Sequence, residues 1–468
     1  MARICGMEPD KPMTHNNTAA SNRMTPSPGT VAGPAEVYTI SQEDSLGFAM
    51  RVMHAAPLGR RARVGISFAT LLFREPAMTL ATATEATPTP LSAVDHVRAM
   101  SEYGQRAEAR AYALGNRGPI RVGADGKLLP EILESYWANG FYVFQGVTGP
   151  EELAELRADI DAVLSRAPVT PDATIDYQGR PTIDHGILKP PYRWAKPLSD
   201  PVGGTDANNG RHPAAMLQPD PGKDAPTWTV ELLDGNLHLS DACLRLYGHP
   251  GLLTAAASIL GDDFVPYNEV TFVKEPGLGP SVAWHQDGTT HWHAADWDQG
   301  AHGFNFMTQL YPSTAGNGVW VLPGSHKRGK ADIKRMVAES GSDRIEGAVP
   351  MLCDAGDTIV TNRQLVHGSF ANSSPDRRIT LNAGFFPRKR VLNVTTKRLN
   401  GNVETYDLTR IEARTRILQI AIDARRQRFP QETPYAYRPM IGREDENRWN
   451  EATRAKVLKN YNQLDMFI

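Results

Sequence analysis

Short apolar or alternating segments, separated by turn residues, fill the sequence between residues 264 and 387. Turn signals such as Pro276-Gly277, Asn317-Gly318 and Pro323-Gly324 divide this region into pieces of strand length. Several short strands with regular turns are typical of a sandwich or barrel. The predicted strands are Tyr267–Lys274, Val282–His285, Phe304–Tyr311, Val319–Leu322, Asp357–Thr361 and Arg378–Phe386.

The pattern before this region alternates between helical and strand periods. Apolar residues at Leu153, Leu156, Ile160 and Leu164 recur at helical spacing, after a Thr148 that can cap the helix. We expect an ordinary packing helix there. Further helices are predicted over Leu129–Ala138 and Pro250–Leu260, with a strand over Phe141–Phe144.

These elements predict an α+β fold with a mainly β core. A double-stranded β-helix, also called a jelly roll and found in cupin-like proteins, suits an internal metal site and flanking helices. We expect residues 1–100 to be a disordered extension, because they mix Pro, Thr, Ala, Ser and Gly without periodicity. Order is expected to begin near Leu128.

The domain prediction assigns residues 101–408 to the jelly roll and 409–468 to a helical extension packed on the core. Residues 167–235 read as an insertion rich in Pro, Gly and Asp. A long irregular segment of this kind is either a lid or disordered, and its aromatic residues favour an ordered cover.

Charge and cysteine content limit the partners of the chain. The 468 residues include 50 basic and 52 acidic ones, so no field of one sign would attract nucleic acid. The cysteines, Cys5, Cys243 and Cys353, form no CxxC pair, which suits a reducing, cytoplasmic location.

The longest strongly apolar run, Val64–Phe73, is too short for a membrane span. A small-molecule substrate is expected, and the sequence does not indicate an oligomeric state.

His285-Gln286-Asp287 and the distant His367 are the strongest candidates for chemistry. Residues i and i+2 of a strand project from one face, so His285 and Asp287 can bind one ion. Two imidazoles and one carboxylate form the facial triad of a mononuclear Fe(II) oxygenase, which leaves three coordination positions open. His-X-Asp alone is a weak signal. His293 competes as a ligand, because His291-X-His293 has the same spacing.

Arg378 follows His367 and opens a strand in which Arg378, Thr380 and Asn382 share a face. A guanidinium group binds a carboxylate bidentately, and the hydroxyl of Thr380 can add a further hydrogen bond. This arrangement predicts an anchor for a 2-oxo acid such as 2-oxoglutarate. The alternative is that Arg378 pairs with an aspartate of the barrel and Arg377 points inward.

In this combination of motifs the chain resembles the phytanoyl-CoA dioxygenase family of Fe(II)/2-oxoglutarate oxygenases, which includes ectoine hydroxylase-like enzymes. The matching segments are Gly140-Phe141-Tyr142-Val143, Gly149-Pro150-Glu151-Glu152-Leu153, Val273-Lys274-Glu275-Pro276, Trp284-His285-Gln286-Asp287-Gly288, Leu322-Pro323-Gly324-Ser325-His326, Gly356-Asp357, His367-Gly368-Ser369 and Arg378. The resemblance runs from about Leu128 to Pro387. The insertion and the C-terminal extension depart from it.

The resemblance implies a role for each matching residue. His285, Asp287 and His367 are expected to bind Fe(II), while Arg378 and Ser369 hold 2-oxoglutarate. Lys274 is expected to assist, and Phe306 is matched to an aromatic residue on the strand after the metal motif.

The predicted reaction uses O2, releases succinate and CO2, and hydroxylates an unactivated C–H bond of a small molecule, lipid or natural-product intermediate. Asp287 favours hydroxylation, because halogenating relatives lack this carboxylate. Desaturation and ring formation remain open. Two other classes also remain open: a non-catalytic jelly-roll binding protein and a Zn or Mn enzyme of the cupin kind.

Overall fold

Residues of two mostly antiparallel sheets line a common cavity. The computed structural model describes residues 92–183, 190–296, 302–397, 403–459 and 461. The larger sheet has eight strands in the order β1-β2-β10-β7-β12-β5-β4-β3, and the smaller sheet has four in the order β6-β11-β8-β9. All described residues belong to one compact unit of the chain, Thr84–Ile468.

The strands of the larger sheet are β1 (Arg117–Gly118), β2 (Phe141–Phe144), β3 (Tyr192–Ala195), β4 (Thr229–Asp234), β5 (Phe264–Lys274), β7 (Phe304–Gln309), β10 (Thr358–Asn362) and β12 (Arg378–Pro387). The smaller sheet contains β6 (Val282–His285), β8 (Trp320–Val321), β9 (Val349–Pro350) and β11 (His367–Ser369). A separate pair is formed by β13 (Thr395–Lys397) and β14 (Val403–Thr405). The helices are α1 (Ala93–Ala113), α2 (Pro130–Asn139), α3 (Pro150–Leu164), α4 (Ala207–Gly210), α5 (Asn236–Leu239), α6 (Asp241–Tyr247), α7 (Pro250–Leu260), α8 (Ile333–Ser340), α9 (Arg388–Val391), α10 (Leu408–Arg428) and α11 (Glu451–Thr453).

Side-chain alternation gives the larger sheet two different faces. On β7, Phe304 and Phe306 join the hydrophobic core, whereas Asn305 and Met307 line the cavity. Strand β12 alternates in the same way, with Leu381 in the core and Thr380 on the cavity side. Because the period of a strand is two, one face is apolar and packed while the other carries the polar groups of the cavity.

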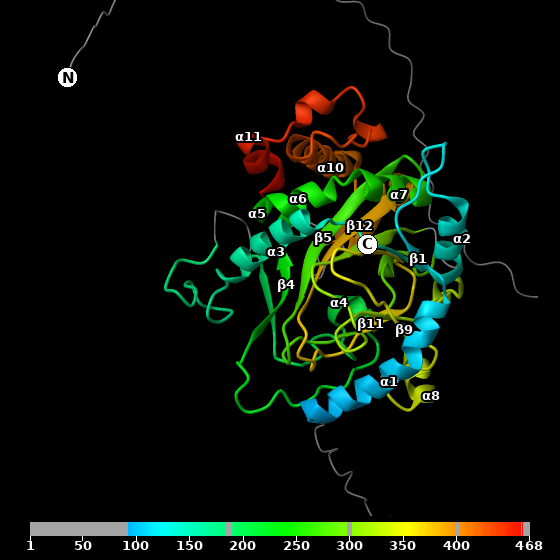
Figure 1. Cartoon of the computed structure of the whole chain (residues 1–468), viewed down its shortest axis with the longest axis vertical. Helices are drawn as coiled ribbons and strands as arrows, with labels where there is room; N and C mark the ends of the chain where they lie inside the picture. The colour runs from blue at the N-terminus through cyan, green and yellow to red at the C-terminus, as the bar shows by residue number, and fades with distance from the viewer. Residues whose placement is uncertain (1–91, 184–189, 297–301, 398–402, 460, 462–468) are drawn as a thin grey trace, which may run out of the picture. The chain divides into compact units, whose positions relative to one another are not determined.

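Helices cover the apolar face, and α3, α6, α7 and α10 contribute to the same hydrophobic core as this face (Figure 1). Helix α10 lies against α6 at Gly248, where a Cβ atom would come within 2.3 Å of the Ala421 carbonyl oxygen. The buried side chain of Arg425 on α10 forms an ion pair of 2.6 Å with Glu152 on α3. Ile417, Ile420 and Ile422 of α10 belong to this core.

The predicted strands between residues 264 and 387 are all confirmed, with small shifts at their ends. The helix Pro250–Leu260 and the strand Phe141–Phe144 have the predicted bounds. The α+β class is also confirmed. No helix among the described residues is both long and apolar enough to cross a membrane. Cys243 and Cys353 are free and buried, and Cys5 lies outside the described residues.

The prediction that order begins near Leu128 is wrong, because α1 begins at Ala93. Its N-cap is Ser92, whose Oγ accepts a hydrogen bond from the Asp95 amide at 3.1 Å. Met100, Tyr103, Ala107 and Ala111 form its buried face, at the spacing that a helix requires. This signal was present in the sequence and was missed. The expected disorder of residues 1–91 lies outside the described residues.

The insertion at 167–235 is irregular over most of its described length, as predicted, but it contains two strands, β3 near its middle and β4 at its end. Strand β4 pairs with β5, and β3 pairs with β4, so both extend the larger sheet. The residues between these strands lie over the cavity and contribute Val202, Asn208, Arg211 and His212 to its lining. The described part of the segment therefore forms part of the cavity wall.

Candidate metal centre and its cavity

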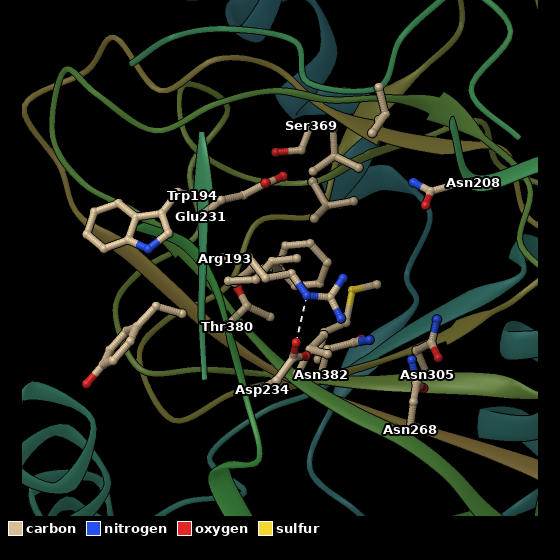
Figure 2. A pocket seen from close by; sticks show the side chains of 18 of the residues that line it. Arg193, Trp194, Asn208, Glu231, Asp234, Asn268, Asn305, Ser369, Thr380 and Asn382 are labelled. Carbon is tan, nitrogen blue, oxygen red and sulfur yellow. Dashed lines mark hydrogen bonds and ion pairs between the residues drawn. The ribbon is translucent and has the colours of Figure 1, made fainter. Parts of the chain in front are cut away.

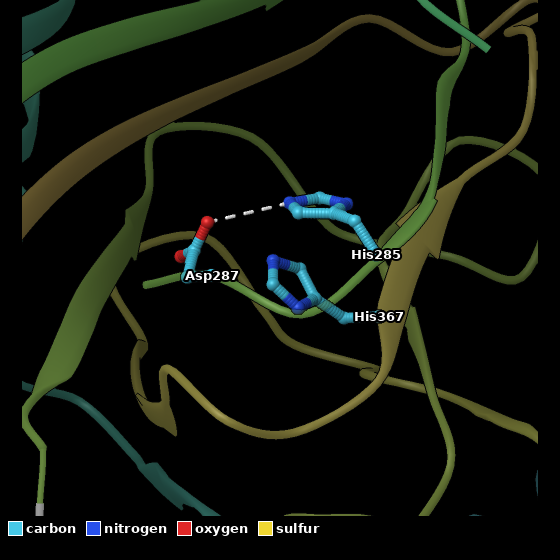
Figure 3. A group of neighbouring side chains, drawn as sticks. All are labelled: His285, Asp287 and His367. Atoms are coloured by element: carbon cyan, nitrogen blue, oxygen red, sulfur yellow. Dashed lines mark ion pairs between the residues drawn. The ribbon is translucent and has the colours of Figure 1, made fainter. Parts of the chain in front are cut away.

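Strand pairing in the smaller sheet brings His285 and His367 together. They are direct Cα partners of the antiparallel pair β6–β11, and Asp287 follows two residues after His285. One ligand atom from each of His285, Asp287 and His367 lies within 4.8 Å of the other two (Figure 3). All three residues are buried. The predicted triad is therefore assembled, and a distance of this order suits three ligands around one ion.

Backbone carbonyl groups orient both imidazoles. Nδ1 of His285 donates to the Ala283 oxygen at 2.8 Å, and Nδ1 of His367 donates to the Leu365 oxygen at 2.9 Å. These bonds leave Nε2 of each ring with a free lone pair. Nε2 of His285 lies 3.5 Å from Oδ1 of Asp287. Burial lowers the pKa of His367 to about 3, so the ring stays neutral at physiological pH. Converging lone pairs of this kind require a cation between them.

Asp287 is held ionised by its surroundings. Nη1 of Arg211 donates to Oδ1 at 2.9 Å, and Nδ2 of Asn305 donates to Oδ2 at 3.0 Å. Nη1 of Arg363 lies 3.7 Å from Oδ2. Burial raises the pKa of Asp287, but the positive charges of Arg363 and Arg211 outweigh it and hold the pKa well below its usual range. A carboxylate in this state is ready to bind a metal ion.

Arg211 and His212 reach the triad from the cover segment, and both were missed in the sequence. The ring of His212 lies 4.4 Å from that of His285, and its Nδ1 atom is buried without a hydrogen-bond partner among the described residues. Asn208 and Asn209, just before this pair, both adopt left-handed backbone conformations, with φ of 53° and 60°. Asparagine tolerates this conformation better than most residues.

The cavity between the sheets has a volume of about 620 Å³ and joins the triad to the cavity-facing residues of β4, β5, β7 and β12 (Figure 2). A cavity of this size is in the range of small-molecule sites. Its lining mixes apolar residues, such as Val270 and Phe272, with asparagine side chains and arginines.

Arg378 is almost completely buried, with 1% of its surface exposed, and it lines the cavity. Its Nη1 donates to the Asn317 carbonyl oxygen at 2.9 Å and to Ser369 Oγ at 3.4 Å. Its Nε atom has no hydrogen-bond partner, and no carboxylate of the described chain forms an ion pair with it. Burial lowers the pKa of Arg378 to about 10, which leaves it charged. An unpaired buried guanidinium is costly and indicates an anionic ligand.

The alternative assignment of Arg377 is wrong. Its guanidinium group forms ion pairs with Asp161 at 2.7 Å and with Glu275 at 2.9 Å, away from the cavity. Ser369 and Thr380 both line the cavity beside Arg378, as predicted. The Thr380 hydroxyl donates to Gln309 at 2.8 Å.

Two of the other predicted residues lie elsewhere. Phe306 faces the hydrophobic core behind β7, so its prediction as a cosubstrate residue is wrong; strand alternation turns Asn305 and Met307 to the cavity instead. Lys274 is the Cα partner of Arg378, but it does not line the cavity, and its Nζ atom donates to the Phe370 carbonyl oxygen.

The competing histidine, His293, is exposed and lies outside the cluster. His291 lies in the short 3-10 turn Thr289–His291, where its Nε2 is 3.0 Å from the Arg390 carbonyl oxygen. The structure therefore removes the alternative ligand pair His291 and His293.

A buried cluster of two histidines and one aspartate, with an unpaired arginine in the same cavity, has the composition of a mononuclear non-haem iron site with a place for a 2-oxo acid. A family model described as phytanoyl-CoA dioxygenase matches residues 136–380, more than half of the chain. The chain belongs to the phytanoyl-CoA dioxygenase family. It is thus an Fe(II)-, 2-oxoglutarate- and O2-dependent dioxygenase.

Characterised relatives share about a quarter of their residues with this chain. A phytanoyl-CoA dioxygenase of Arabidopsis thaliana is 23% identical over 269 residues, which cover 55% of this chain and 88% of the relative. An ectoine dioxygenase of Halomonas elongata is 24% identical over 323 residues, covering 63% of this chain and 78% of the relative. Among solved structures, EctD from S. alaskensis with 2-oxoglutarate and 5-hydroxyectoine has a TM-score of 0.39 and 18% identity, covering 59% of this chain and 83% of that one.

Proposed function

We propose that this dioxygenase hydroxylates an unactivated C–H bond of a small molecule, lipid or natural-product intermediate. His285, Asp287 and His367 bind Fe(II), and Arg378, Ser369 and Thr380 hold 2-oxoglutarate. One observation carries the proposal: three converging metal-ligand atoms and an unpaired buried cation line the same cavity. The enzyme class follows from the family, whereas the residue roles and the hydroxylation outcome rest on this arrangement.

The proposal extends to the fold. The two facing sheets, with the ligands on the smaller one and the cavity between them, fit a double-stranded β-helix. In this assignment the dioxygenase domain includes α1 and ends near residue 408, residues 167–235 are its inserted cover, and the following residues pack on its outside.

The donor set fits Fe(II). Neutral imidazoles and an ionised carboxylate suit this metal, and no thiol lies among the three residues. The carbonyl groups of Ala283 and Leu365 fix the ring tautomers, so that each Nε2 is free to coordinate. Three protein ligands leave the other coordination positions for cosubstrate and O2.

Arg378 fits the distal carboxylate of 2-oxoglutarate. Its free Nε–H is a buried donor, and a carboxylate is the group that a guanidinium binds best. Ser369 and Thr380 border the same position. The Ser369 hydroxyl accepts from Arg378 and can donate its proton to the carboxylate, whereas Thr380 would first exchange its hydrogen bond to Gln309. Beside Arg378, the buried Lys274 donates from Nζ to the Phe370 carbonyl oxygen without touching the cavity, and burial together with the charge of Arg378 lowers its pKa well below the usual value.

When bound, Fe(II) and 2-oxoglutarate supply the oxidising chemistry, in which O2 converts 2-oxoglutarate to succinate and CO2 and a C–H bond to C–OH. The protein orients and shields these groups. Asn305 holds Oδ2 of Asp287 in place, Arg211 forms an ion pair with its Oδ1, and His212 covers one side of His285. The cover segment limits the entry of water to the cavity.

The test is iron-dependent turnover by the purified protein. We expect anaerobic binding of 2-oxoglutarate to the Fe(II)-loaded protein, seen as a visible charge-transfer band, and release of succinate when O2 is admitted. Binding without succinate release under any substrate panel would identify a non-catalytic binding protein. Activity restored by Zn(II) or Mn(II) without 2-oxoglutarate would identify an enzyme of the cupin kind, in which Arg378 has no evident role.

A further inference from the structure

Beyond the triad and the 2-oxoglutarate position, the larger sheet carries a group of amide side chains on its cavity face. Asn382 follows Thr380 on β12, and Asn268 lies on the adjacent strand β5 (Figure 2). Asn382 is the Cα partner of Val270, so the two asparagines are diagonal neighbours across the strand pair. Diagonal neighbours in a sheet lie roughly 7–8 Å apart, a span that two adjacent polar groups of a ligand can bridge.

Neither of these amides is satisfied by the protein. The Oδ1 atoms of Asn382 and Asn268 are buried and have no hydrogen-bond partner. Within the described residues, neither amide nitrogen donates a hydrogen bond. Asn382 is only 7% exposed and Asn268 is partly buried, so the protein shields both amides from most of the bulk water. Leaving a buried polar group unpaired costs about 1–3 kcal/mol, which indicates that a ligand supplies the bonds.

Asn305 differs from these two, because both ends of its amide are occupied. It donates to Asp287 at 3.0 Å and accepts from Arg363 at 3.3 Å. Asn305 therefore positions the metal-site carboxylate, whereas Asn268 and Asn382 remain available. The two amides without partners therefore lie next to Asn305, at the border of the metal site, where a substrate would bind.

The backbone leaves room for a ligand at this position. Gly384 follows Asn382 by two residues, and a Cβ atom there would lie 2.6 Å from Asn268 Oδ1 and 3.0 Å from Asn305 Oδ1. Any side chain at Gly384 would push both amides out of their positions. Glycine is thus required between them by close approach.

The charged groups around these amides are paired. Arg193 forms an ion pair with Asp234 at 2.6 Å, and Arg211 is paired with Asp287. Since Arg378 is assigned to the cosubstrate, the described lining residues at this end of the cavity include no unpaired arginine or lysine for a phosphate or a carboxylate. Glu231 is the remaining carboxyl group of the lining, and burial raises its pKa to about 7. Apolar surface is supplied by Trp194 and Val270.

We propose that Asn268 and Asn382 form a substrate subsite for a neutral, hydroxyl-rich group, such as a polyol or a sugar unit. The inference rests on the proposed function and names the substrate class for the same site. A hydroxyl group both donates and accepts, and an amide does the same, so two neighbouring hydroxyls satisfy both side chains. An apolar ring face such as that of Trp194 suits the C–H face of a sugar.

The test uses the full chain loaded with Fe(II) and 2-oxoglutarate under anaerobic conditions. Saturation-transfer NMR would measure binding of neutral probes (myo-inositol, methyl glucoside and maltose), cationic probes (choline and lysine) and anionic probes (octanoate and octanoyl-CoA). We expect binding of at least one neutral probe, and about tenfold weaker binding in both Asn382→Leu and Asn268→Ala, from the loss of one buried hydrogen bond each. Asn139→Leu, at the end of α2 and outside the cavity lining, is the matched control and should bind like the parent protein.

Several outcomes would overturn the inference. Binding of no neutral probe would do so, as would equal binding in the parent protein and both variants. Binding of cationic probes alone would contradict it too, because the substrate would then be recognised by the carboxyl group of Glu231. The affinity for 2-oxoglutarate, measured on the same samples, separates failure of the proposed function from failure of the subsite. If the parent protein does not bind 2-oxoglutarate, the proposed function is contradicted. If it binds 2-oxoglutarate but no neutral probe, only the subsite is contradicted.

Discussion

Arg211 donates a hydrogen bond to Oδ1 of Asp287 at 2.9 Å, across 76 residues of sequence. This bond joins the segment that covers the cavity to the carboxylate of the triad. The same oxygen faces Nε2 of His285, so the guanidinium group and a metal ion compete for it.

We predict that Arg211→Gln strengthens metal binding. Removing a competing ion pair of this partly exposed kind is worth about 1 kcal/mol, or about fivefold in affinity. Titration calorimetry with Mn(II), a redox-stable substitute for Fe(II), would measure the change. Arg193→Gln is the control, since its ion pair with Asp234 does not involve the triad. Weaker Mn(II) binding in Arg211→Gln would show that Arg211 orients the carboxylate instead of competing for it.

Arg378 should determine the affinity for 2-oxoglutarate. Arg378→Gln removes charge-assisted hydrogen bonds worth about 1.5–3 kcal/mol, so the KM for 2-oxoglutarate should rise roughly 10- to 100-fold, with a smaller change in kcat. The neighbouring Arg377→Gln should leave this KM unchanged, because Arg377 pairs with Asp161 and Glu275 outside the cavity. Equal KM values for the two variants would place the cosubstrate elsewhere.

Loss of one triad residue should abolish tight metal binding. His367→Ala removes a direct ligand, and even groups that only support a ligand contribute about 10- to 100-fold to metal affinity, so we expect a loss of at least this order. His293→Ala provides the comparison, because His293 is exposed and lies outside the cluster. Metal content after loading with Fe(II) and gel filtration would distinguish them. Retention of iron by His367→Ala would contradict the assignment.

The attachment of α10 depends on a buried ion pair. Nη1 of Arg425 lies 2.6 Å from Glu152, and its Nε lies 2.6 Å from Glu432. Arg425→Ala leaves the buried Glu152 carboxylate unpaired and should lower the free energy of unfolding by about 3–5 kcal/mol. Urea unfolding would measure this loss. Arg428→Gln, which removes exposed ion pairs on the same helix, should change the unfolding midpoint little.

His249 should make the fold sensitive to acid. Burial, followed by the charge of Arg425, lowers its pKa from 6.5 to about 3, while its Nδ1 caps α7 by accepting from the Leu252 amide. Between these values the unfolded state binds the extra proton. Neutral His249 therefore makes its full contribution to the free energy of unfolding above about pH 6.5, the pKa of an unfolded histidine. This contribution is lost as the pH falls from about 6.5 towards 3.

His249→Asn keeps an acceptor at the cap but removes the titration, so acid unfolding should begin at a lower pH. Circular dichroism along a pH titration would follow the transition. The exposed His293 offers a control, and His293→Asn should leave the profile unchanged. An identical acid midpoint in His249→Asn would assign the acid sensitivity to other buried histidines.

The local parts of the site could be predicted from sequence. Strand-length segments and turn residues gave the bounds of β6, β10 and β12, and two-residue spacing correctly put His285 and Asp287 together. The alternation of side chains along β12 was the only sequence signal that pointed Arg378, and not Arg377, into the cavity. The structure places the two side chains in this way.

The remaining parts depend on information that sequence spacing does not contain. Phe306 was assigned to the wrong face because the register of β7 on β12 pairs it with Ala383, and this register cannot be read from either strand alone. Arg211 and His212 follow two left-handed asparagines in an aperiodic segment, so no period indicates where their side chains point. Only the tertiary path of the cover segment brings them to the triad.

The pairing of His285 with His367 also bears on how the protein is maintained. A metal ion held by both rings would tie β6 to β11 across the 82 residues that separate them (367 − 285). A link of this kind favours the folded chain in proportion to how far the free metal exceeds its dissociation constant. The metal would then stabilise the folded chain as well as serve the reaction, so metal-free protein should unfold at a lower temperature than the loaded protein.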